Sequence, residues 1–304
     1  MTVAVTQAKR VGASAVACAS TGNTSASLAA YAAQAGIPGL VFVPSGQVAM
    51  GKLTQTLAYG ARTLIVRGDF DDCMKLAQSC ARELGVYLVN SVNPWRIEGQ
   101  KTIVFDILRQ LQWSTPDFIV LPAGNLGNLS AFGKALREAL SLGLITHLPR
   151  LVAVQAEGAA PFARSFDEQF AVRHRVRADT VATAIRIGDP ASYHRAVEVI
   201  LETDGIVLCV PDDAIVEAKM AIDAAGVGCE AASAASLAGI RVLTQKGVMQ
   251  STNRVVAVLT GHVLKDPGML VELHQHSTHP RANRQIEIDA HVAAVEQVLN
   301  KPHS

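Results

Sequence analysis

The stretch Phe118-Ile-Val-Leu-Pro-Ala-Gly-Asn-Leu-Gly-Asn128 joins a short apolar run to a glycine-rich turn, and a helical pattern continues to Ser141. Such an apolar run without polar alternation is typical of a strand that is buried on both faces of a parallel sheet. Gly124 and Gly127 permit positive φ and close approach of another group to the backbone. The strand–turn–helix order therefore favours an α/β fold with a parallel sheet.

This turn is also a candidate anion site. Backbone N–H groups at the start of a helix can bind a phosphate, and ligands of open α/β sheets bind at the carboxyl ends of the strands. The spacing is not a dinucleotide-binding fingerprint, because the third glycine is missing. An ordinary turn between a strand and a helix explains the same residues, so both interpretations stay open.

The same alternation of apolar runs and helical patterns extends over most of the chain. We predict an α/β fold with two open, mostly parallel sheets flanked by helices. The predicted strands are Ala15–Ala19, Leu40–Val43, Thr63–Val66, Tyr87–Asn90, Phe118–Leu121, Leu151–Gln155, Ile206–Val210 and Val255–Leu259. The predicted helices run from about Thr24 to Gln34, Phe70 to Leu84, Glu98 to Leu111, Asn128 to Ser141, Asp213 to Ala225 and Glu230 to Gln245.

Two domains are predicted, because Asn93-Pro94-Trp95 interrupts the pattern after the fourth strand. The small α/β domain covers residues 14–95, and the large α/β domain covers residues 1–13 and 96–304. The tail from about His274 is polar and rich in histidine, and it closes with a helical pattern from Ile286 to Leu299. We expect this tail to pack against the outside of the large domain.

Composition excludes several classes of function. The chain is 49% hydrophobic and has a formal net charge of +1, so it carries no broad basic surface for nucleic acid. No apolar run approaches the ~20 residues that a membrane-spanning helix needs. The 5 cysteines are odd in number and lack C-x-x-C spacing, which fits free thiols in a reducing compartment. We expect a soluble, cytoplasmic protein without a metal site.

A second strand–turn–helix junction is dense in hydroxyl groups. The stretch Ala19-Ser-Thr-Gly-Asn-Thr-Ser25 holds four hydroxyls and one amide. Capping the following helix needs only one of these groups. The excess favours recognition of a polar ligand, while a capped helix with spare hydroxyls is the alternative.

Two further segments supply cations. The stretch Gly46-Gln-Val-Ala-Met-Gly51-Lys52 nearly spells a phosphate-binding P-loop, but a leucine follows where Ser or Thr must hold Mg²⁺. Lys52 is therefore expected to be a plain anion contact or a solvated lysine. Asn90, Ser91 and Arg96 follow the fourth predicted strand, and an arginine there can bind phosphate bidentately. A surface turn is the alternative.

Four of these segments together resemble the threonine synthase family, whose members are fold type II enzymes that use pyridoxal phosphate and are built like the tryptophan synthase β subunit. The resemblance extends from Met1 to about Met269. It rests on Ala-Ser-Thr-Gly-Asn-Thr-Ser at 19–25, Asn-Ser-Val-Asn-Pro-Trp-Arg-Ile-Glu-Gly-Gln-Lys at 90–101, Pro-Ala-Gly-Asn-Leu-Gly-Asn at 122–128 and Leu-Thr-Gly-His at 259–262. Each match alone is weak, whereas four matches in the same order are specific.

The resemblance implies a role for each matched position. Asn23 would form a hydrogen bond with the ring hydroxyl of the cofactor, pyridoxal 5'-phosphate, and Thr260 would face its ring nitrogen. The cofactor phosphate would lie against Gly124, Asn125, Leu126, Gly127 and Asn128. The residues that would hold the substrate, O-phosphohomoserine, are Ser20, Thr21, Thr24, Lys52, Asn90, Ser91 and Arg96. Its carboxylate would lie on the Ser/Thr turn, and its phosphate would lie near the two cations and Ser91.

The implied reaction releases phosphate from Cγ of this small-molecule substrate and adds water at Cβ, which gives L-threonine. Enzymes of this fold are commonly homodimers. The nearest alternative is a serine/threonine dehydratase-like lyase, although such lyases usually carry a run of glycines where this chain has Gly124-Asn-Leu-Gly-Asn128. A catalytically inactive binding or regulatory paralogue of the same fold is an alternative of a different class.

The sequence departs from the family pattern in two places. The family's catalytic lysine, which forms a Schiff base with the cofactor, lies in a Ser-Phe-Lys-Asp-Arg-Gly motif directly before a segment like Met1-Thr-Val-Ala-Val. We therefore expect this lysine upstream of Met1, and Lys9 is a poor substitute because it lies on the following helical pattern. Cys229-Glu-Ala-Ala-Ser stands where relatives often have Glu-Pro, which leaves the role of Glu230 open.

Overall fold

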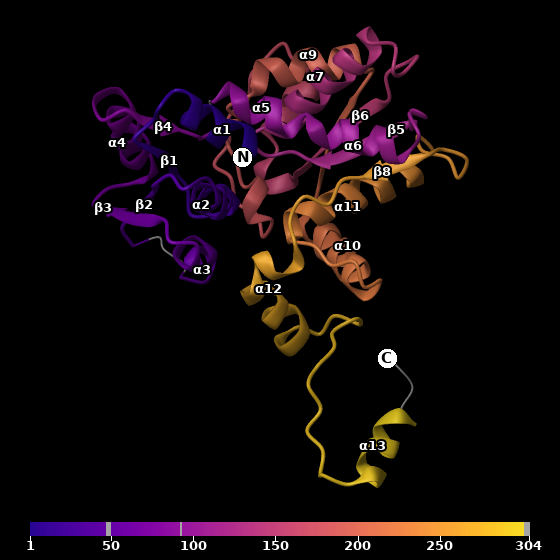
Figure 1. Cartoon of the computed structure of the whole chain (residues 1–304). Helices are drawn as coiled ribbons and strands as arrows, with labels where there is room; N and C mark the ends of the chain where they lie inside the picture. Colours follow the sequence, from indigo (N-terminus) through magenta and orange to yellow (C-terminus); the bar gives the residue numbers. More distant parts are fainter. Residues whose placement is uncertain (47–49, 92, 301–304) are drawn as a thin grey trace.

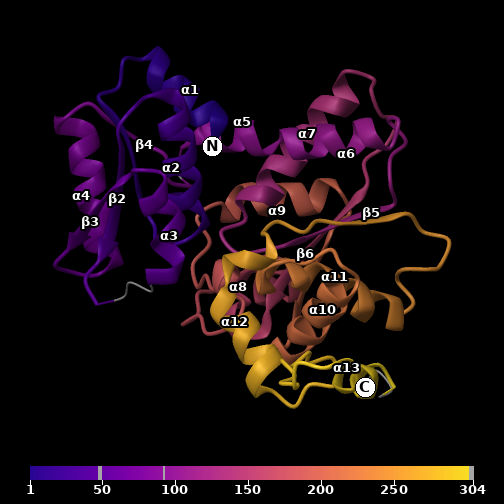
Figure 2. The ribbon, with the colours of Figure 1, turned by 60° about the horizontal axis from the view of Figure 1, so that its bottom comes forward.

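Two four-stranded parallel sheets form the centre of the molecule in the computed structural model, which describes residues 1–46, 50–91 and 93–300 without the side chains of residues 50–52. The two sheets lie next to each other in both views (Figure 1, Figure 2). All the described strand pairs are parallel. The predicted fold class is therefore confirmed.

The first sheet has the strand order β3-β2-β1-β4. Successive side chains of β1 enter two different apolar cores, because neighbouring residues of a strand point to opposite faces. Val16 and Cys18 pack with α1 and α2, whereas Ala15, Ala17 and Ala19 pack with α4. The elements are α1 (Thr2–Arg10), β1 (Ala15–Ala19), α2 (Asn23–Ala35), β2 (Gly39–Pro44), α3 (Met50–Ala58), β3 (Arg62–Val66), α4 (Phe70–Glu83) and β4 (Val86–Leu88).

The second sheet has the order β7-β6-β5-β8 and is covered on both faces. Ile119 and Leu121 of β5 pack with α7 and α9, whereas Phe118 and Val120 pack with α10 and α11. The elements are α5 (Pro94–Gln100), α6 (Thr102–Gln110), β5 (Phe118–Pro122), α7 (Gly127–Ser141), β6 (Arg150–Ala156), η1 (Glu157–Ala159), α8 (Pro161–Asp167), η2 (Thr183–Ile185), α9 (Tyr193–Glu202), β7 (Ile206–Val210), α10 (Asp212–Ala224), α11 (Ala231–Gln245), β8 (Val255–Ala257), η3 (Val263–Lys265), α12 (Pro267–Val271), η4 (Glu272–His276) and α13 (Val292–Leu299).

The predicted strands are all present, but some helices differ from their predictions. The helix predicted from Glu98 to Leu111 is divided into α5 and α6, because the Val104 N–H bonds the carbonyl of Lys101, three residues back, and tightens the turn. The helices α3, α8, α9 and α12 were not predicted from the sequence. No helix in the described ranges is long and apolar enough to cross a bilayer, and no metal-binding group of three or more His, Cys, Asp or Glu residues lies within them.

The amino-terminal helix α1 lies at the junction of the two halves. Ala4, Val5 and Ala8 belong to the same apolar core as Val16 and Leu28 of the first sheet. The helix also packs along α5, which leads to the second sheet (Figure 1). The domain boundaries proposed from the sequence stay a prediction.

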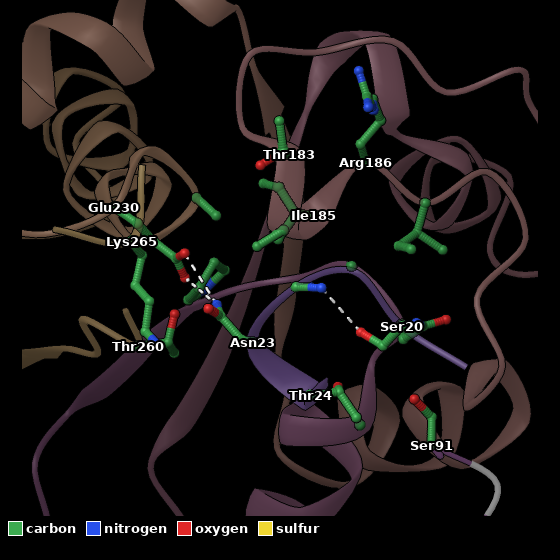
Figure 3. A pocket seen from close by; sticks show the side chains of 18 of the residues that line it. Ser20, Asn23, Thr24, Ser91, Thr183, Ile185, Arg186, Glu230, Thr260 and Lys265 are labelled. Carbon is green, nitrogen blue, oxygen red and sulfur yellow. Dashed lines mark hydrogen bonds between the residues drawn. The ribbon is translucent and has the colours of Figure 1, made fainter. Parts of the chain in front are cut away.

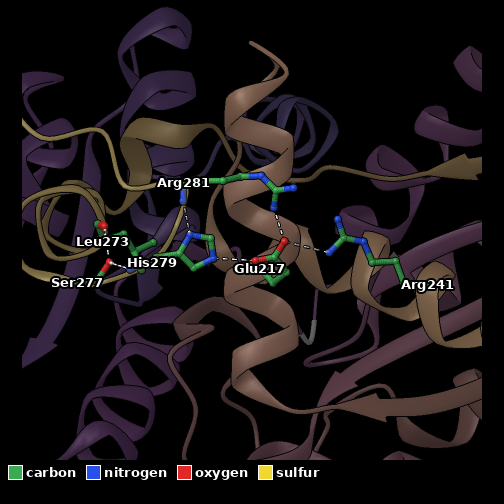
Figure 4. Close-up of polar contacts among 6 residues, drawn as sticks. All are labelled: Glu217, Arg241, Leu273, Ser277, His279 and Arg281. Carbon is green, nitrogen blue, oxygen red and sulfur yellow. Dashed lines mark hydrogen bonds and ion pairs between the residues drawn. The ribbon is translucent and has the colours of Figure 1, made fainter. Parts of the chain in front are cut away.

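The C-terminal tail differs from its prediction. The helix expected from Ile286 to Leu299 is the shorter α13, and none of its residues is buried, so the expected packing is wrong for this helix. The tail is held closer to its start instead (Figure 4). His279 Nε2 lies 2.7 Å from Glu217 Oε2 on α10, and the Arg281 guanidinium donates to the other oxygen of the same carboxylate. The apolar pattern of the tail predicted a helix but not its point of attachment. The described tail contacts in this region are made to Glu217 on α10.

We expect the substitution Glu217→Gln to release this tail, since the amide loses the charge that attracts Arg281. Hydrogen bonds from His279 and then Arg281 hold the pKa of Glu217 below its ordinary value of 4.5. The stabilisation is therefore complete above about pH 4.5 and is lost as the pH falls through the lowered folded-state pKa. Protection of residues 277–284 against hydrogen exchange, relative to the intrinsic rate at each pH, should fall in the variant at pH 7 and in the unaltered chain only at acid pH. Glu287→Gln, in the same tail, serves as the control, and unchanged exchange in Glu217→Gln would contradict the prediction.

Candidate functional site

The carboxyl ends of β1, β4, β5 and β8 face one cavity of about 950 Å³, which residues of both sheets line (Figure 3). The sequence-predicted residues in its wall are Ser20, Thr21, Asn23, Thr24, Asn90, Ser91, Arg96, Gly124, Asn125, Leu126, Gly127, Asn128 and Thr260. The remaining one, Lys52, belongs to α3, but its side chain is outside the described part of the structure. Segments that are far apart in the sequence thus form one site.

The glycine-rich loop after β5 forms a tightly packed part of this wall. A Cβ atom on Gly124 would lie 3.0 Å from the Cα of Ile185 and 3.3 Å from the carbonyl oxygen of Ala184, so only glycine fits between β5 and η2 without displacing backbone. Leu126 has a φ of 63°, which is uncommon for a residue with a side chain. Its carbonyl accepts hydrogen bonds from the N–H and the hydroxyl of Ser130, which fixes the start of α7.

The two asparagines of this loop brace it through their side chains. Asn125 Oδ1 accepts a hydrogen bond of 3.3 Å from the Ala191 N–H, and Asn128 Oδ1 accepts one from Gln100 Nε2. The first N–H groups of a helix have no partner within the helix, and Gly127 lies in the cavity wall. The loop therefore presents backbone donors and the positive end of the α7 dipole to the cavity.

The Ser/Thr turn after β1 uses two of its four hydroxyls for its own structure. The Gly22 N–H donates to Ser20 Oγ over 3.2 Å, and Ser25 Oγ donates to the Gly22 carbonyl over 2.8 Å. Thr21 and Thr24 also line the cavity, and no hydrogen bond of their hydroxyls is made to another described residue. These two hydroxyls can therefore serve a ligand.

Asn90 links two segments of the cavity wall through its side chain. Its Oδ1 accepts from the Ala19 N–H over 3.0 Å, and its Nδ2 donates to the Ala19 carbonyl over 2.9 Å. Both ends of the amide are thus bonded to the last residue of β1. This pair of bonds sets the distance between the Ser/Thr turn and the segment that carries Ser91.

Arg96 is a half-buried cation in the cavity wall. Its Nη1 donates to the carbonyl of Val89 over 2.9 Å, whereas its buried Nε has no hydrogen-bond partner among the described atoms. Burial lowers the pKa of Arg96, and the neighbouring Cys18 is not an anion, since burial raises the pKa of that thiol to about 12. A guanidinium with an unpaired buried donor, and with no carboxylate among its electrostatic partners, is suited to an anionic ligand.

The opposite wall is organised by α11. Ser233, which is fully buried, accepts hydrogen bonds from the N–H groups of Thr260 and Gly261 over 3.0 and 2.8 Å. Its hydroxyl also lies 3.0 Å from Thr260 Oγ1, so it fixes both the backbone and the side chain of Thr260. Glu230 directly precedes α11 and reaches the Asn23 amide across the cavity (Figure 3).

Several residues in the wall or directly behind it were not predicted from the sequence. Gln100 and Ser233 act through side-chain contacts with distant segments, which no local pattern reveals. Arg186 follows η2 in a segment without helical or strand periodicity. Lys265 lies a few residues after Thr260 and donates to Gln55 of α3, so it connects the two halves at the edge of the cavity.

Residues 1–261 match the model of a family described as pyridoxal-phosphate dependent enzyme. A threonine synthase from Methanosarcina acetivorans is 43% identical to the chain over 301 residues, which cover 98% of the chain and 72% of that protein. This chain belongs to the threonine synthase family. A threonine synthase from Methanocaldococcus jannaschii is 45% identical over 88% of the chain and 66% of that protein. One from Mycobacterium tuberculosis is 47% identical over 88% of the chain and 72% of that protein.

Solved structures support the fold of this threonine synthase family member. The threonine synthase from Escherichia coli superimposes with a TM-score of 0.69 at 20% identity, over 94% of this chain and 70% of that one. A fungal L-serine ammonia-lyase from Rhizomucor miehei gives a TM-score of 0.72 at 20% identity, over 85% of this chain and 81% of that one. At these identities the likeness concerns the fold alone. It agrees with the fold type II architecture expected from the sequence.

Pyridoxal phosphate is the cofactor of the threonine synthase family, and the cavity has features that fit it. The loop Gly124–Asn128 combines a glycine packed tightly against the backbone of Ile185 with the amino end of a long helix, which suits a phosphate group. Asn23 and Thr260 supply neutral polar groups from two other walls of the same cavity. The residues present therefore fit an aromatic phosphate ester held by one charged end and a few directed hydrogen bonds.

Proposed function

We propose that this protein is a threonine synthase that converts O-phospho-L-homoserine and water to L-threonine and phosphate, with pyridoxal phosphate as its cofactor. One observation carries the proposal. The cavity contains two separate features for anions, the glycine loop at the start of α7 and the incompletely paired Arg96. The cofactor has a single phosphate, so the second feature favours a substrate that is itself phosphorylated.

The substrate-binding residues divide by the charge that they recognise. Thr21 and Thr24, with Ser20, would hold the substrate carboxylate on the turn before α2. Arg96 would donate to the substrate phosphate together with Ser91 and Lys52. We assign Asn90 a positioning role, because both ends of its amide are already bonded to Ala19.

The cofactor-binding residues would hold the ring from three sides. The loop Gly124–Asn128 would bind the phosphate, Asn23 would donate to the ring hydroxyl, and Thr260 would face the ring nitrogen. The bound cofactor supplies an electron sink next to the substrate's Cα. Thr260 offers a neutral hydroxyl whose direction is set by Ser233, so it does not add a permanent negative charge beside the ring nitrogen.

The alternatives make different products. A serine/threonine dehydratase-like lyase would form a 2-oxo acid and ammonia from L-threonine or L-serine, and an inactive paralogue would bind ligands without turnover. Arg96 and Ser91 in one cavity favour the phosphorylated substrate. We also propose, from the sequence pattern, a small domain of residues 14–95 and a large domain of residues 1–13 and 96–304. The composition favours a cytoplasmic location, and the family resemblance favours a homodimer.

The proposed function is tested by incubating the protein with pyridoxal phosphate and O-phospho-L-homoserine. From a chain that includes the expected Ser-Phe-Lys-Asp-Arg-Gly motif, we expect L-threonine and inorganic phosphate in equal amounts. Formation of 2-oxobutyrate from L-threonine, without action on O-phospho-L-homoserine, would favour the dehydratase instead. Turnover only after extension of the chain through the expected Ser-Phe-Lys-Asp-Arg-Gly motif would locate the catalytic lysine before Met1. Ligand binding without turnover in both forms would identify the inactive paralogue.

A further inference from the structure

The buried carboxylate of Glu230 lies across the cavity from Asn23, the residue proposed to bind the ring hydroxyl of the cofactor. Asn23 Nδ2 lies 3.1 Å from Glu230 Oε1 and 3.1 Å from Glu230 Oε2 (Figure 3). Asn23 starts α2 beside the first sheet, whereas Glu230 precedes α11 beside the second. Glu230 is 7% exposed, so its carboxylate is largely withdrawn from water. These are the only hydrogen bonds of the Asn23 side chain to other described residues.

The chemistry of the two groups fixes which end of the asparagine amide faces Glu230. An ionised carboxylate accepts hydrogen bonds and cannot donate, whereas the two ends of an asparagine amide have opposite roles. Only the NH₂ end can therefore be directed at Glu230. Because Nδ2 is equally distant from the two carboxylate oxygens, one N–H bond directed between them can make both contacts, which leaves the other N–H for a ligand.

Gly261 leaves the space that the Glu230 carboxylate occupies beside Asn23. A Cβ atom on Gly261 would lie 2.1 Å from both Glu230 Cδ and Glu230 Oε1. The backbone supports the same position, since the Glu230 N–H donates to the Gly261 carbonyl over 3.0 Å. A side chain on residue 261 would thus push the carboxylate away from Asn23, and glycine leaves the space that the contact needs.

We infer that Glu230 is a positioning residue that selects the orientation of the Asn23 amide, so that an N–H and not the carbonyl faces the ring hydroxyl of the cofactor. This inference rests on the proposed function, in which Asn23 binds that hydroxyl. Without Glu230 the amide can rotate so that its two ends exchange places, and its carbonyl oxygen would then face the cofactor's oxygen. Glu230 itself touches neither the substrate nor the reacting atoms in this role.

The test compares two ligands that differ in one group, pyridoxal phosphate and its analogue that lacks the ring hydroxyl. Their affinities are measured by calorimetry for the unaltered chain and for the variants Glu230→Gln and Gly261→Ala. Glutamine keeps the size of the side chain but can donate or accept, so it no longer selects one end of Asn23. The alanine displaces the carboxylate without removing it. We expect both variants to bind pyridoxal phosphate about 3- to 10-fold more weakly, which corresponds to one net hydrogen bond.

The analogue should bind all three proteins within about 2-fold, because it lacks the oxygen to which Asn23 donates. Glu198→Gln, an exposed acid on α9, serves as the matched control, and circular dichroism checks that each variant is folded. An equal loss for both ligands, or no loss for either, would overturn the positioning role. Failure of the unaltered chain to bind pyridoxal phosphate would instead refute the proposed function, so the two failures are distinguishable.

Discussion

Replacing Arg96 by methionine is expected to weaken binding of O-phospho-L-homoserine by about 30- to 5000-fold, the range for truncating one partner of a buried charge pair. The guanidinium is half-buried, its Nε has no described partner, and no carboxylate is among its electrostatic partners. The substrate phosphate would supply the missing acceptor and countercharge. Methionine keeps much of the apolar stem and removes every donor. Calorimetric titration of the unaltered chain and the variant measures the change.

The control ligand for this experiment is L-homoserine, which lacks the phosphate. Its affinity should change by less than about 3-fold, well below the effect expected for the phosphorylated compound. Arg96→Lys should recover part of the loss, because it restores the charge without the planar fork. Arg137→Met, at an exposed ion pair with Glu202, is the matched surface variant. A similar loss for both ligands would show that Arg96 acts through its bond to the Val89 carbonyl and not through the phosphate.

Lys219→Met is expected to destabilise the folded chain by about 3–5 kcal/mol, the range for removing one partner of a buried ion pair. The Lys219 side chain is 1% exposed, and its Nζ donates to Asp223 Oδ2 over 2.6 Å and to the Cys229 carbonyl over 2.7 Å. Asp223 also accepts from the Cys229 N–H over 3.1 Å. The lysine therefore ties the end of α10 to the segment that leads into Glu230 and α11. Urea unfolding followed by circular dichroism measures the loss.

A second substitution separates charge from packing at this position. Lys219→Met combined with Asp223→Asn removes both charges, so the double variant should be more stable than Lys219→Met alone. Lys246→Met, at the exposed end of α11, should change the free energy of unfolding by less than about 0.5 kcal/mol. A loss below about 1 kcal/mol for Lys219→Met would mean that Asp223 is adequately solvated without its partner.

The fold could be predicted from the sequence because its strands are buried on both faces. Phe118 and Ile119 enter different cores, so the apolar run of β5 has no polar interruption. The site loops were accessible for a related reason, since glycine and hydroxyl residues gather directly after such runs. Gly124 is closely approached by the backbone of Ala184 and Ile185, and the glycine in the sequence already indicated a position of close approach.

Side-chain contacts between distant segments could not be predicted in this way. Asn23 and Glu230 are 207 residues apart, and no local sequence pattern around either residue predicts their contact. A lysine such as Lys219, on a helix, is ordinarily expected to be exposed, because its burial depends on partners that only the folded chain brings close. The attachment of the tail to Glu217 has the same origin. Local patterns predict elements, whereas pairings of this kind require the tertiary structure.

Asn90 carries a consequence for sequence variation in this family. Its carboxamide accepts from and donates to the backbone of Ala19, as a peptide group of a neighbouring strand would do. The side chain thus continues the sheet for one step after the β4 backbone has left it. Aspartate at this position would lose the donor, serine would be too short, and glutamine would be too long. Residue 90 should therefore tolerate little evolutionary drift, because its amide takes the place of a main-chain peptide group.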